Sequence, residues 1–387
     1  MLNPDHYIGR EQAYAKHSIL RHYLQRLTYK VGWSGRAITY VDGFAGPWNA
    51  QADDLSDTSP MIAIAELTGA QTAIGERGRV RPRIRCIFVE KNRAASELLR
   101  KTVAALDGVE ATVIHGRFER HIPDIIKHVS GSFGFFFIDP KGWTRFGMRT
   151  VEPILQHSPG EVLINFQTPY ISRFVDKGPD RVAPSFEDLF GSSDFRDQWR
   201  GLSGLDREDA IVRTYCDRVK TVGRFPWVVS TPILHPTDNR TGYHLVYATR
   251  HVEGLRTFKG AEKTAFKAQI SARAMAQQTR RNKREESEEL FGAEEFGDGG
   301  HCLDRRNRYL ALARQQLLGE VKSRGVLSYD ALEQSVTQNP LVWESDVKEW
   351  LQSECSATHI RILGMTTRQK GPSRGAGHTI EYIPQAR

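Results

Sequence analysis

Short apolar runs alternate with helical patterns through the first two thirds of the chain. The runs are continuously apolar, as in strands that are buried on both faces, and glycine-rich or polar turns end them. Buried strands that alternate with helices predict a parallel sheet with helices on both faces. The expected strands are 38–41, 85–90, 112–115, 133–139 and 161–166.

Between these strands, apolar side chains recur at helical spacing. We expect 69–82, which is rich in Gly and Arg, to be a connector. The pair Ser59-Pro60 is a good N-cap and first helical position, so helix capping alone explains it. The expected helices are 11–29, 61–67, 93–106, one that ends at 126, and 151–156.

Two later apolar runs, 226–233 and 243–249, have no long helix between them. They predict an antiparallel strand pair that ends the parallel sheet. The polar and aromatic stretch 172–209 is an insertion, which we expect to form helices over the edge where a substrate enters. The fold class is therefore α/β, with a doubly wound, Rossmann-like sheet over residues 1–258.

The last third of the chain differs from the rest in its charge composition and in the order of its expected elements. Residues 259–304 carry a mixed charge run and read as a charged helical or linker segment. Residues 305–387 predict three helices and then two strands around a basic loop, which is a winged-helix-like order. The loop suits phosphate contacts through Arg368, Lys370 and Arg374, whereas the third helix is acidic and suits a DNA groove poorly. Nucleic acid and protein both remain open as partners of this domain.

Composition narrows the function classes. The 387 residues carry a formal net charge of +8, which favours a polyanionic partner such as nucleic acid. The four cysteines show no CxxC spacing, so we expect neither a disulfide framework nor a zinc site, and a cytoplasmic location. No apolar run is long enough to span a membrane, and no signal-peptide pattern opens the chain.

Candidate ligand-binding residues follow the strands, and parallel strands bring their carboxyl ends to one rim. Asp42-Gly43-Phe44 and Gly46 form a glycine loop, Glu90 ends the second strand, and Arg117-Phe118 follow the third. An acid at the second strand suits a ribose diol, and a nearby aromatic suits a base. Because neither GxGxxG nor a Walker A sequence occurs, a nucleoside cofactor without phosphates fits better, and S-adenosylmethionine is the obvious one.

These motifs carry a family resemblance. The Lys16-His17 helix, YVDGFAGP, Thr58-Ser59-Pro60, FVE and FFFIDPKGW together resemble the bacterial three-Cys-motif partner proteins. The resemblance covers roughly residues 16–249 and implies a class I, S-adenosylmethionine-dependent methyltransferase-like fold.

A more distant likeness is to the ribosomal RNA adenine-N6 methyltransferases with a Lys-His helix before the first strand. It implies that His17, Ser59 and Glu90 contact the cofactor and that Asp139 serves the target amine. Asp139 and the Pro140 carbonyl would accept the amine proton, and Trp143 would stack on a flipped base.

This chain departs from that family's Asp-Pro-Pro-aromatic motif. Lys141 stands where the second proline belongs and shifts the aromatic by one position, which puts adenine in doubt as the target. Tyr170, after the fifth strand, is a further candidate for the substrate pocket.

These residues and the resemblance leave two candidate functions. The first is an S-adenosylmethionine-dependent methyltransferase that acts on nucleic acid, on a base amine, with the terminal domain as a docking module. The second is a methyltransferase-like binding protein that serves a partner protein and transfers nothing itself. A nicotinamide or flavin oxidoreductase is disfavoured because GxGxxG is absent.

Overall fold

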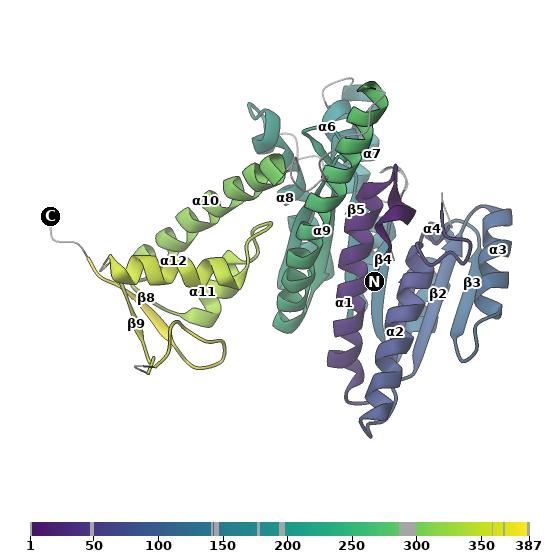
Figure 1. Ribbon diagram of the computed structural model, residues 1–387, viewed down its shortest axis with the longest axis horizontal. Coiled ribbons are helices and arrows are strands. Elements are labelled where there is room, and N and C mark those ends of the chain that lie inside the picture. The colour runs from purple at the N-terminus through teal and green to yellow at the C-terminus, as the bar shows by residue number, and fades with distance from the viewer. Residues whose placement is uncertain are drawn as a thin grey trace. The chain divides into compact units, whose positions relative to one another are not determined.

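The computed structural model describes residues 2–46, 50–140, 142, 147–175, 179–192, 198–285, 299–357, 359–366 and 368–384. The chain divides into two compact units, Met1–Asp298 and Gly299–Arg387, which are described in turn. Figure 1 labels their helices and strands.

The first unit contains a seven-stranded sheet in the order β3-β2-β1-β4-β5-β7-β6. Strands β1 to β5 are parallel, and β7 is antiparallel to both of its neighbours, β5 and β6. The expected α/β fold class, a doubly wound Rossmann-like sheet that ends in an antiparallel strand pair, is confirmed. The strands are β1 (Ile38–Asp42), β2 (Ile84–Glu90), β3 (Glu110–His115), β4 (Phe133–Ile138), β5 (Gly160–Phe166), β6 (Trp227–Leu234) and β7 (Thr241–Thr249).

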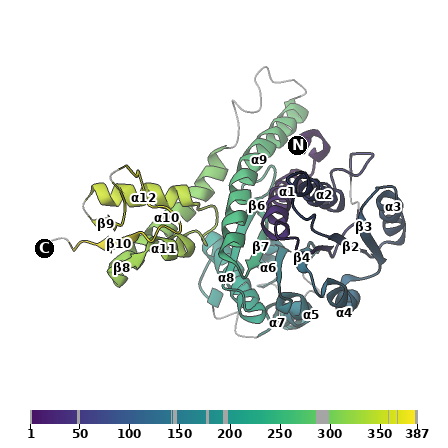
Figure 2. The ribbon, with the colours of Figure 1, turned by 90° about the horizontal axis from the view of Figure 1, so that it is seen from below.

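Alternation along the strands divides the core into two clusters. Tyr40 and Phe137 point to the face covered by α1 and α2, whereas Val41 and Ile138 point to the face covered by α4, α5 and α8. Figure 2 shows these two helical layers on either side of the sheet. The helices that flank the strands are α1 (Glu11–Gly32), α2 (Ser59–Glu76), α3 (Arg93–Ala104), α4 (Phe118–Val129), α5 (Met148–Gln156) and α8 (Gly204–Gly223).

Helix α2 is longer than the sequence pattern predicts. The expectation of a connector at 69–82 is wrong as far as Glu76, because Ala70 and Ile74 continue the buried stripe of Ala63 and Leu67. Gly69 does not end the helix; a Cβ there would meet nothing within 4 Å.

The insertion forms helices, as expected. Helices α6 (Thr168–Val175) and α7 (Pro179–Phe190) follow β5. Their apolar side chains Ile171, Phe186 and Phe190 join the core cluster on the α5 and α8 face.

Helix α9 (Val252–Glu285) is the longest in the described chain and crosses the boundary expected at 258. It packs along α1 and buries Phe258, Ala261 and Ala265 in the core. Residues 259–285 of the segment expected to be helical or a linker are therefore helical and belong to the first unit.

The described part of the second unit combines three helices with a small antiparallel sheet. Its three-stranded antiparallel sheet has the order β8-β10-β9. The elements are α10 (Gly299–Arg324), β8 (Val326–Ser328), α11 (Tyr329–Val336), α12 (Glu344–Ser356), β9 (Ile360–Leu363) and β10 (Thr379–Tyr382). The sequence reading missed β8 because three residues are too few to show a period.

Within the described residues, no helix combines the length and apolar character that a membrane span requires.

Candidate functional site

The strand order brings the candidate residues to one rim. Asp42, the last residue of β1, is level with Phe88 of β2 and with Phe137 of β4. Glu90 and Asp139 each lie two residues further along those neighbouring strands. The glycine loop after β1 therefore starts between the two acids, at the point where the chain order of the strands reverses.

Asp42 is fully buried and serves the loop that follows it. Ser59 Oγ donates to its Oδ2 at 2.6 Å, and the Phe44 N–H donates to its Oδ1 at 3.0 Å. Tyr40 OH contributes a longer bond of 3.4 Å. Burial raises the pKa of Asp42 to about 6, against the opposing effect of the Ser59 and Phe44 hydrogen bonds.

Ser59 does not cap α2, contrary to the capping explanation. The N-cap position belongs to Thr58, and Ser59 is the first helical residue. Its hydroxyl instead joins the start of α2 to Asp42, so two candidate cofactor residues are bonded to each other.

Phe118 lies against the glycine loop. A Cβ on Gly43 would meet the Phe118 ring at 3.0 Å, so any larger residue would require the ring to shift by a few tenths of an ångström. Phe118 is 2% exposed, and its ring centroid lies 5.8 Å from that of Phe44. The face of Phe118 is thus used in packing the loop, while Phe44 is only partly buried.

Glu90 accepts hydrogen bonds from the turns that follow β2 and β3. Its Oε1 accepts the Asn92 N–H at 2.5 Å, and its carbonyl accepts the Gly116 N–H at 2.9 Å. Gly116 has a φ of 155°, a conformation that favours glycine. Arg117 follows as the N-cap of α4 with its side chain about half exposed.

Asp139 is the centre of a charged cluster. Lys16 of α1 forms an ion pair with its Oδ2, and Asn165 of β5 donates from Nδ2 to its Oδ1 at 2.5 Å. The Asp139 side chain is 22% exposed, and that of Lys16 is 11% exposed. Lys16 Nζ also lies 5.9 Å from the Phe137 ring centroid. Both carboxylate oxygens are held from elements far apart in the sequence.

His17 follows Lys16 on α1, but its side chain contacts the N-terminal segment. Its Nδ1 is 3.1 Å from Tyr7 OH at the end of the 3-10 helix η1 (Pro4–Tyr7). Burial lowers the pKa of His17 well below its usual value, and the charges of Lys16 and Arg10 act in the same direction. The imidazole is therefore neutral at physiological pH.

A narrow cavity adjoins the cluster on the α7 and α8 side of the sheet. Pro140, Asn165, Gln167 and Tyr215 contribute to its lining. Tyr170, in the first turn of α6, is half exposed. Lys141 and Trp143 lie outside the described residues.

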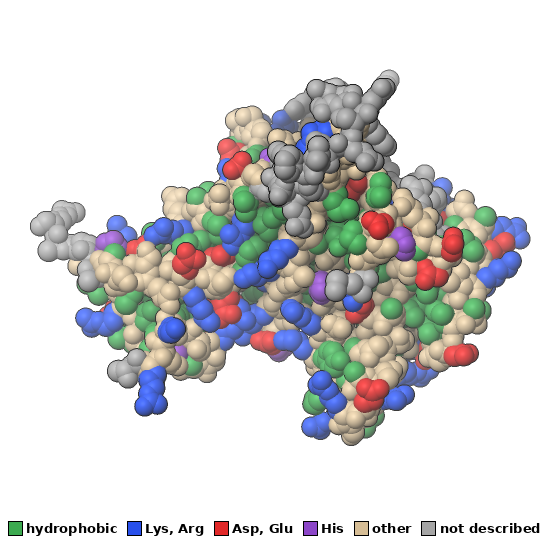
Figure 3. All heavy atoms as spheres, in the orientation of Figure 1, with side chains coloured by type: hydrophobic (Ala, Val, Ile, Leu, Met, Phe, Trp, Pro, Cys, Tyr) green, Lys and Arg blue, Asp and Glu red, His purple; other side chains and the backbone are tan. Residues whose placement is uncertain are grey.

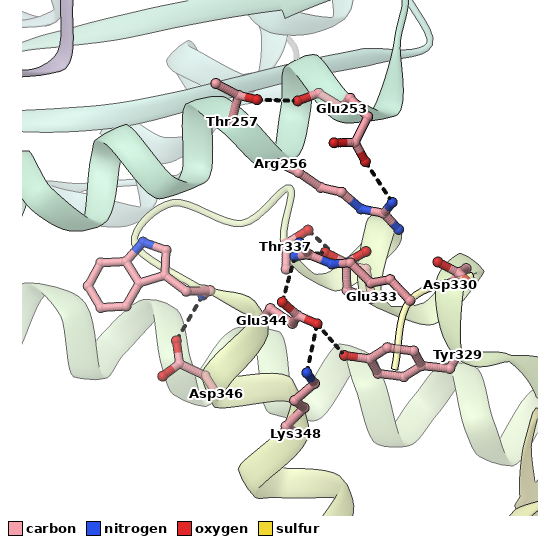
Figure 4. Close-up of polar contacts among 12 residues, drawn as sticks. Glu253, Arg256, Thr257, Tyr329, Asp330, Glu333, Thr337, Glu344, Asp346 and Lys348 are labelled. Atoms are coloured by element: carbon pink, nitrogen blue, oxygen red, sulfur yellow. Dashed lines mark hydrogen bonds and ion pairs between the residues drawn. The ribbon is translucent and has the colours of Figure 1, made fainter. Parts of the chain in front are cut away.

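The candidate residues of the second unit differ in environment. Arg374 pairs with Glu333 at 2.8 Å and with Glu344 at 3.0 Å, whereas Arg368 and Lys370 are exposed. Figure 4 shows Glu344 between Tyr329 and Lys348, which bond to it at 3.2 and 2.9 Å. The guanidinium of Arg374 thus helps to organise the fold of this unit.

Sequence reasoning missed two members of the cluster. Asn165 is a polar residue within the otherwise apolar end of β5, and this was the signal available for it. Lys16 appeared only beside His17, although a lysine within the buried stripe of α1 requires an anionic partner. Among the described residues, no group of His, Cys, Asp and Glu has an arrangement that would hold a metal ion.

Comparison with known proteins assigns this chain to no family. No family model matches the chain, and no curated protein matches it. One similar solved structure is protein yhhF of Escherichia coli, provisionally assigned as a methyltransferase, with 15% identity and a TM-score of 0.24 over 39% of this chain and 70% of that one. Another is protein LPL1258 of Legionella pneumophila, family DUF519, with 10% identity and a TM-score of 0.33 over 60% and 85%. At these scores the fold description rests on the strand order, not on the neighbours.

Proposed function

We propose that this protein is an S-adenosylmethionine-dependent methyltransferase that acts on a base amine of nucleic acid. The observation that carries the proposal is the position of Asp139. It lies at the strand end beside the glycine loop, partly exposed, with its carboxylate oriented by Lys16 and Asn165.

The residues of the rim fit a nucleoside cofactor. Gly43 and Gly46 keep the loop free of side-chain bulk, and Asp42 with Ser59 fixes its path. Glu90 remains as the acid for the ribose hydroxyls, with Oε1 oriented by the Asn92 N–H. Arg117 and Phe44 are the candidates beside the base. Asp42 and Ser59 act here by shaping the loop, a narrower role than direct contact.

Asp139 is the residue that would bind and orient the target amine. When bound, the cofactor supplies an electrophilic methyl group on sulfur. A carboxylate offers about four acceptor positions, so Lys16 and Asn165 leave room for an amine N–H. Asp139 would orient the amine lone pair toward the methyl group, and the Pro140 carbonyl would hold the second N–H. As the amine takes up the methyl group from the sulfur of the cofactor, Asp139 or solvent would accept the amine proton.

A non-catalytic binding protein is the second candidate. The Lys16 ion pair favours it, because the ammonium occupies an acceptor position on the Asp139 carboxylate that a target amine would otherwise use. Lys141 in place of the second proline, and the resemblance to the three-Cys-motif partner proteins, point the same way. In this reading the rim binds the cofactor or an analogue, and the partner protein does the chemistry.

Transfer of labelled methyl from S-adenosylmethionine to total RNA and to genomic DNA separates the two. We expect label in one of the nucleic acids with the unaltered protein, and none with Asp139→Ala. Asp124→Ala, an exposed acid of α4 paired with Lys127, is the matched control and should transfer normally. Absence of transfer by the unaltered protein, with cofactor binding intact, would favour the binding protein.

A further inference from the structure

The segment between α2 and β2 carries arginines that the candidate site does not use. Residues 77–83, which we call the arginine segment, have the sequence RGRVRPR, and all four arginines are exposed. Glu76 is the single acidic residue between positions 71 and 85. In the turn between α1 and β1, Arg36 is exposed as well, and positions 29–37 contain no acidic residue. Positive charge therefore gathers at the amino ends of β1 and β2.

Most of these charges have no acidic partner. Arg83 forms an ion pair with Glu110 of β3 at 2.7 Å, and Lys30 forms one with Glu253 of α9. Four other guanidiniums form neither an ion pair nor a side-chain hydrogen bond within the described part of the chain, namely those of Arg36, Arg77, Arg79 and Arg81. Four cations against the one acid of this region, Glu76, leave a local excess of three positive charges.

Contacts with α1 bring two of these arginines together. The Arg77 guanidinium carbon lies 5.7 Å from the centroid of the Tyr29 ring, and that of Arg79 lies 5.1 Å from the centroid of the Trp33 six-membered or indole ring system. Tyr29 and Trp33 are four residues apart at the end of α1, so their side chains leave the helix on one face, about 6 Å apart along its axis. Both guanidiniums are therefore held on the same surface by aromatic rings.

The other two arginines lie beside this pair. A Cβ on Gly75 would overlap with the Arg81 side chain, which therefore lies against the last turn of α2. Gly35, the neighbour of Arg36, packs against the arginine segment, because a Cβ there would lie 3.4 Å from Val80 Cγ1. Figure 3 shows basic side chains around the lower ends of α1 and α2 in the view of Figure 1. The four arginines thus share the surface at the ends of these two helices.

The donors of this surface remain available to a ligand. Arg77 is the C-cap residue of α2, and a cation there stabilises the helix dipole by about 0.3–1 kcal/mol. None of the four guanidiniums, however, donates to a carbonyl of the described residues, so capping leaves their N–H groups unused. Each guanidinium carries five N–H donors and can bind a phosphate through two parallel hydrogen bonds while its plane stacks on an aromatic ring. A ligand with several phosphates fits this arrangement.

We propose that Arg36, Arg77, Arg79 and Arg81 dock the phosphate backbone of nucleic acid at the amino-terminal end of the sheet. The proposal deepens the proposed function and rests on it for the choice of nucleic acid over another polyanion. Contacts to phosphates give affinity without sequence choice, which the target pocket would supply.

The position of this surface sets a minimum size for the substrate. The arginine segment precedes β2 and Glu90 ends it, so seven strand residues separate the surface from the rim, or about 23 Å at 3.3 Å per residue. A duplex that touches both ends must be at least about seven base pairs long, at 3.4 Å per base pair. The substrate would therefore be a polynucleotide and not a single nucleotide.

Fluorescence anisotropy tests this surface across a salt series, with labelled RNA and DNA oligonucleotides longer than that span, single-stranded and duplex. We expect the triple variant Arg77→Gln, Arg79→Gln, Arg81→Gln to raise Kd at least about tenfold at low salt. Its salt slope should fall by about 2, since each lost phosphate contact removes roughly 0.7–0.9. Lysine at the same three positions keeps the charge and should keep the slope.

The control triple removes the same charge from scattered positions. It replaces three exposed cations that form no ion pair within the described residues, by Lys101→Gln of α3, Arg213→Gln of α8 and Lys267→Gln of α9. Because only the long-range attraction of the net charge changes, Kd should rise less than about threefold and the slope should stay within about 0.7 of the wild type.

Equal losses in the two glutamine triples would overturn the proposal, because they would reflect net charge alone. Failure of the unaltered protein to bind any of the oligonucleotides would overturn it too, and its capture by phosphatidylserine vesicles in that case would assign the arginines to an anionic lipid surface. Calorimetry with S-adenosylhomocysteine on the same proteins keeps the two claims apart. Cofactor binding without nucleic-acid binding removes the docking surface and leaves the cofactor site, whereas the converse removes the methyltransferase and leaves the surface.

Discussion

Lys16 and Asp139 form an ion pair across 123 positions of the chain, joining the first helix to the end of the fourth strand. Neither side chain is freely exposed, and Asn165 holds the second oxygen of the same carboxylate. The pair fixes the direction of Asp139 and places a positive charge at the candidate transfer site.

Removing the Lys16 ammonium should lower methyl transfer while leaving the affinity for the cofactor nearly unchanged. Lys16→Ala leaves Asp139 held by Asn165 alone, so we expect labelled methyl transfer to fall at least tenfold, or about 1.4 kcal/mol in the barrier. The affinity for S-adenosylhomocysteine should change little, and Lys16→Arg should restore part of the transfer. Lys30→Ala, an exposed lysine of the same helix paired with Glu253, is the control. Normal transfer by Lys16→Ala would show that the pair is structural only.

The buried carboxyl of Asp42 predicts a pH dependence of stability. Its pKa rises from 3.8 to about 6 through burial, so the folded state holds a proton that the unfolded state has released between these values. The stability that this proton contributes is complete below about pH 4 and is lost as pH rises to about 6. The difference of 2.2 units corresponds to roughly 3 kcal/mol.

Urea unfolding of the wild-type protein and of Asp42→Asn at several pH values measures this contribution. The stability of the wild type relative to the variant should fall between pH 4 and pH 6 and stay level above. Ser59→Ala should move the fall to higher pH, since the Ser59 hydrogen bond favours the charged form. If the difference in unfolding free energy between the wild type and Asp42→Asn does not change with pH, the raised pKa of Asp42 is contradicted.

Glu161 should be important for the stability of the first unit. This buried acid of β5 accepts hydrogen bonds from Tyr23 of α1 at 2.5 Å and from Thr249 of β7 at 2.7 Å. Glu161→Leu leaves two buried hydroxyls without that acceptor, at about 1–3 kcal/mol each. We expect a loss of about 2–4 kcal/mol in urea unfolding, against less than 0.5 for Glu97→Leu on the surface of α3.

Arg374 should act on stability rather than on nucleic-acid binding. Arg374→Ala removes a partner from Glu333, which is 1% exposed, so the second unit should lose about 2–3 kcal/mol. Arg368→Ala and Lys370→Ala, both exposed, should leave its stability unchanged. Limited proteolysis of the full chain compares the three variants. Equal resistance to proteolysis would contradict the structural role of Arg374.

The sequence allowed the sheet and its rim to be predicted because strand ends carry strong local signals. The apolar run into Asp42-Gly43, and Glu90 at the end of FVE, can be recognised without knowledge of any partner. The extent of α2 was not recognised, because Gly69 looks like a helix end unless the burial of Ala70 and Ile74 is known.

Pairings between distant residues were harder to predict. The bond from Ser59 to Asp42 and the contact of Phe118 with Gly43 depend on how α2 and α4 lie against the sheet. No spacing in the sequence encodes the pairing of Lys16 with Asp139. A polar residue in an apolar stretch, such as Asn165 in β5, marks a site but not its partner.

Isothermal titration with S-adenosylmethionine and S-adenosylhomocysteine tests the central claim most directly. We expect both to bind, and Glu90→Ala to weaken binding by more than about 1 kcal/mol, because hydrogen bonds to charged groups contribute roughly 1.5–3 kcal/mol. Asp139→Ala should leave that affinity nearly unchanged. If neither compound binds the wild-type protein, the account of this rim as a methyltransferase cofactor site is wrong.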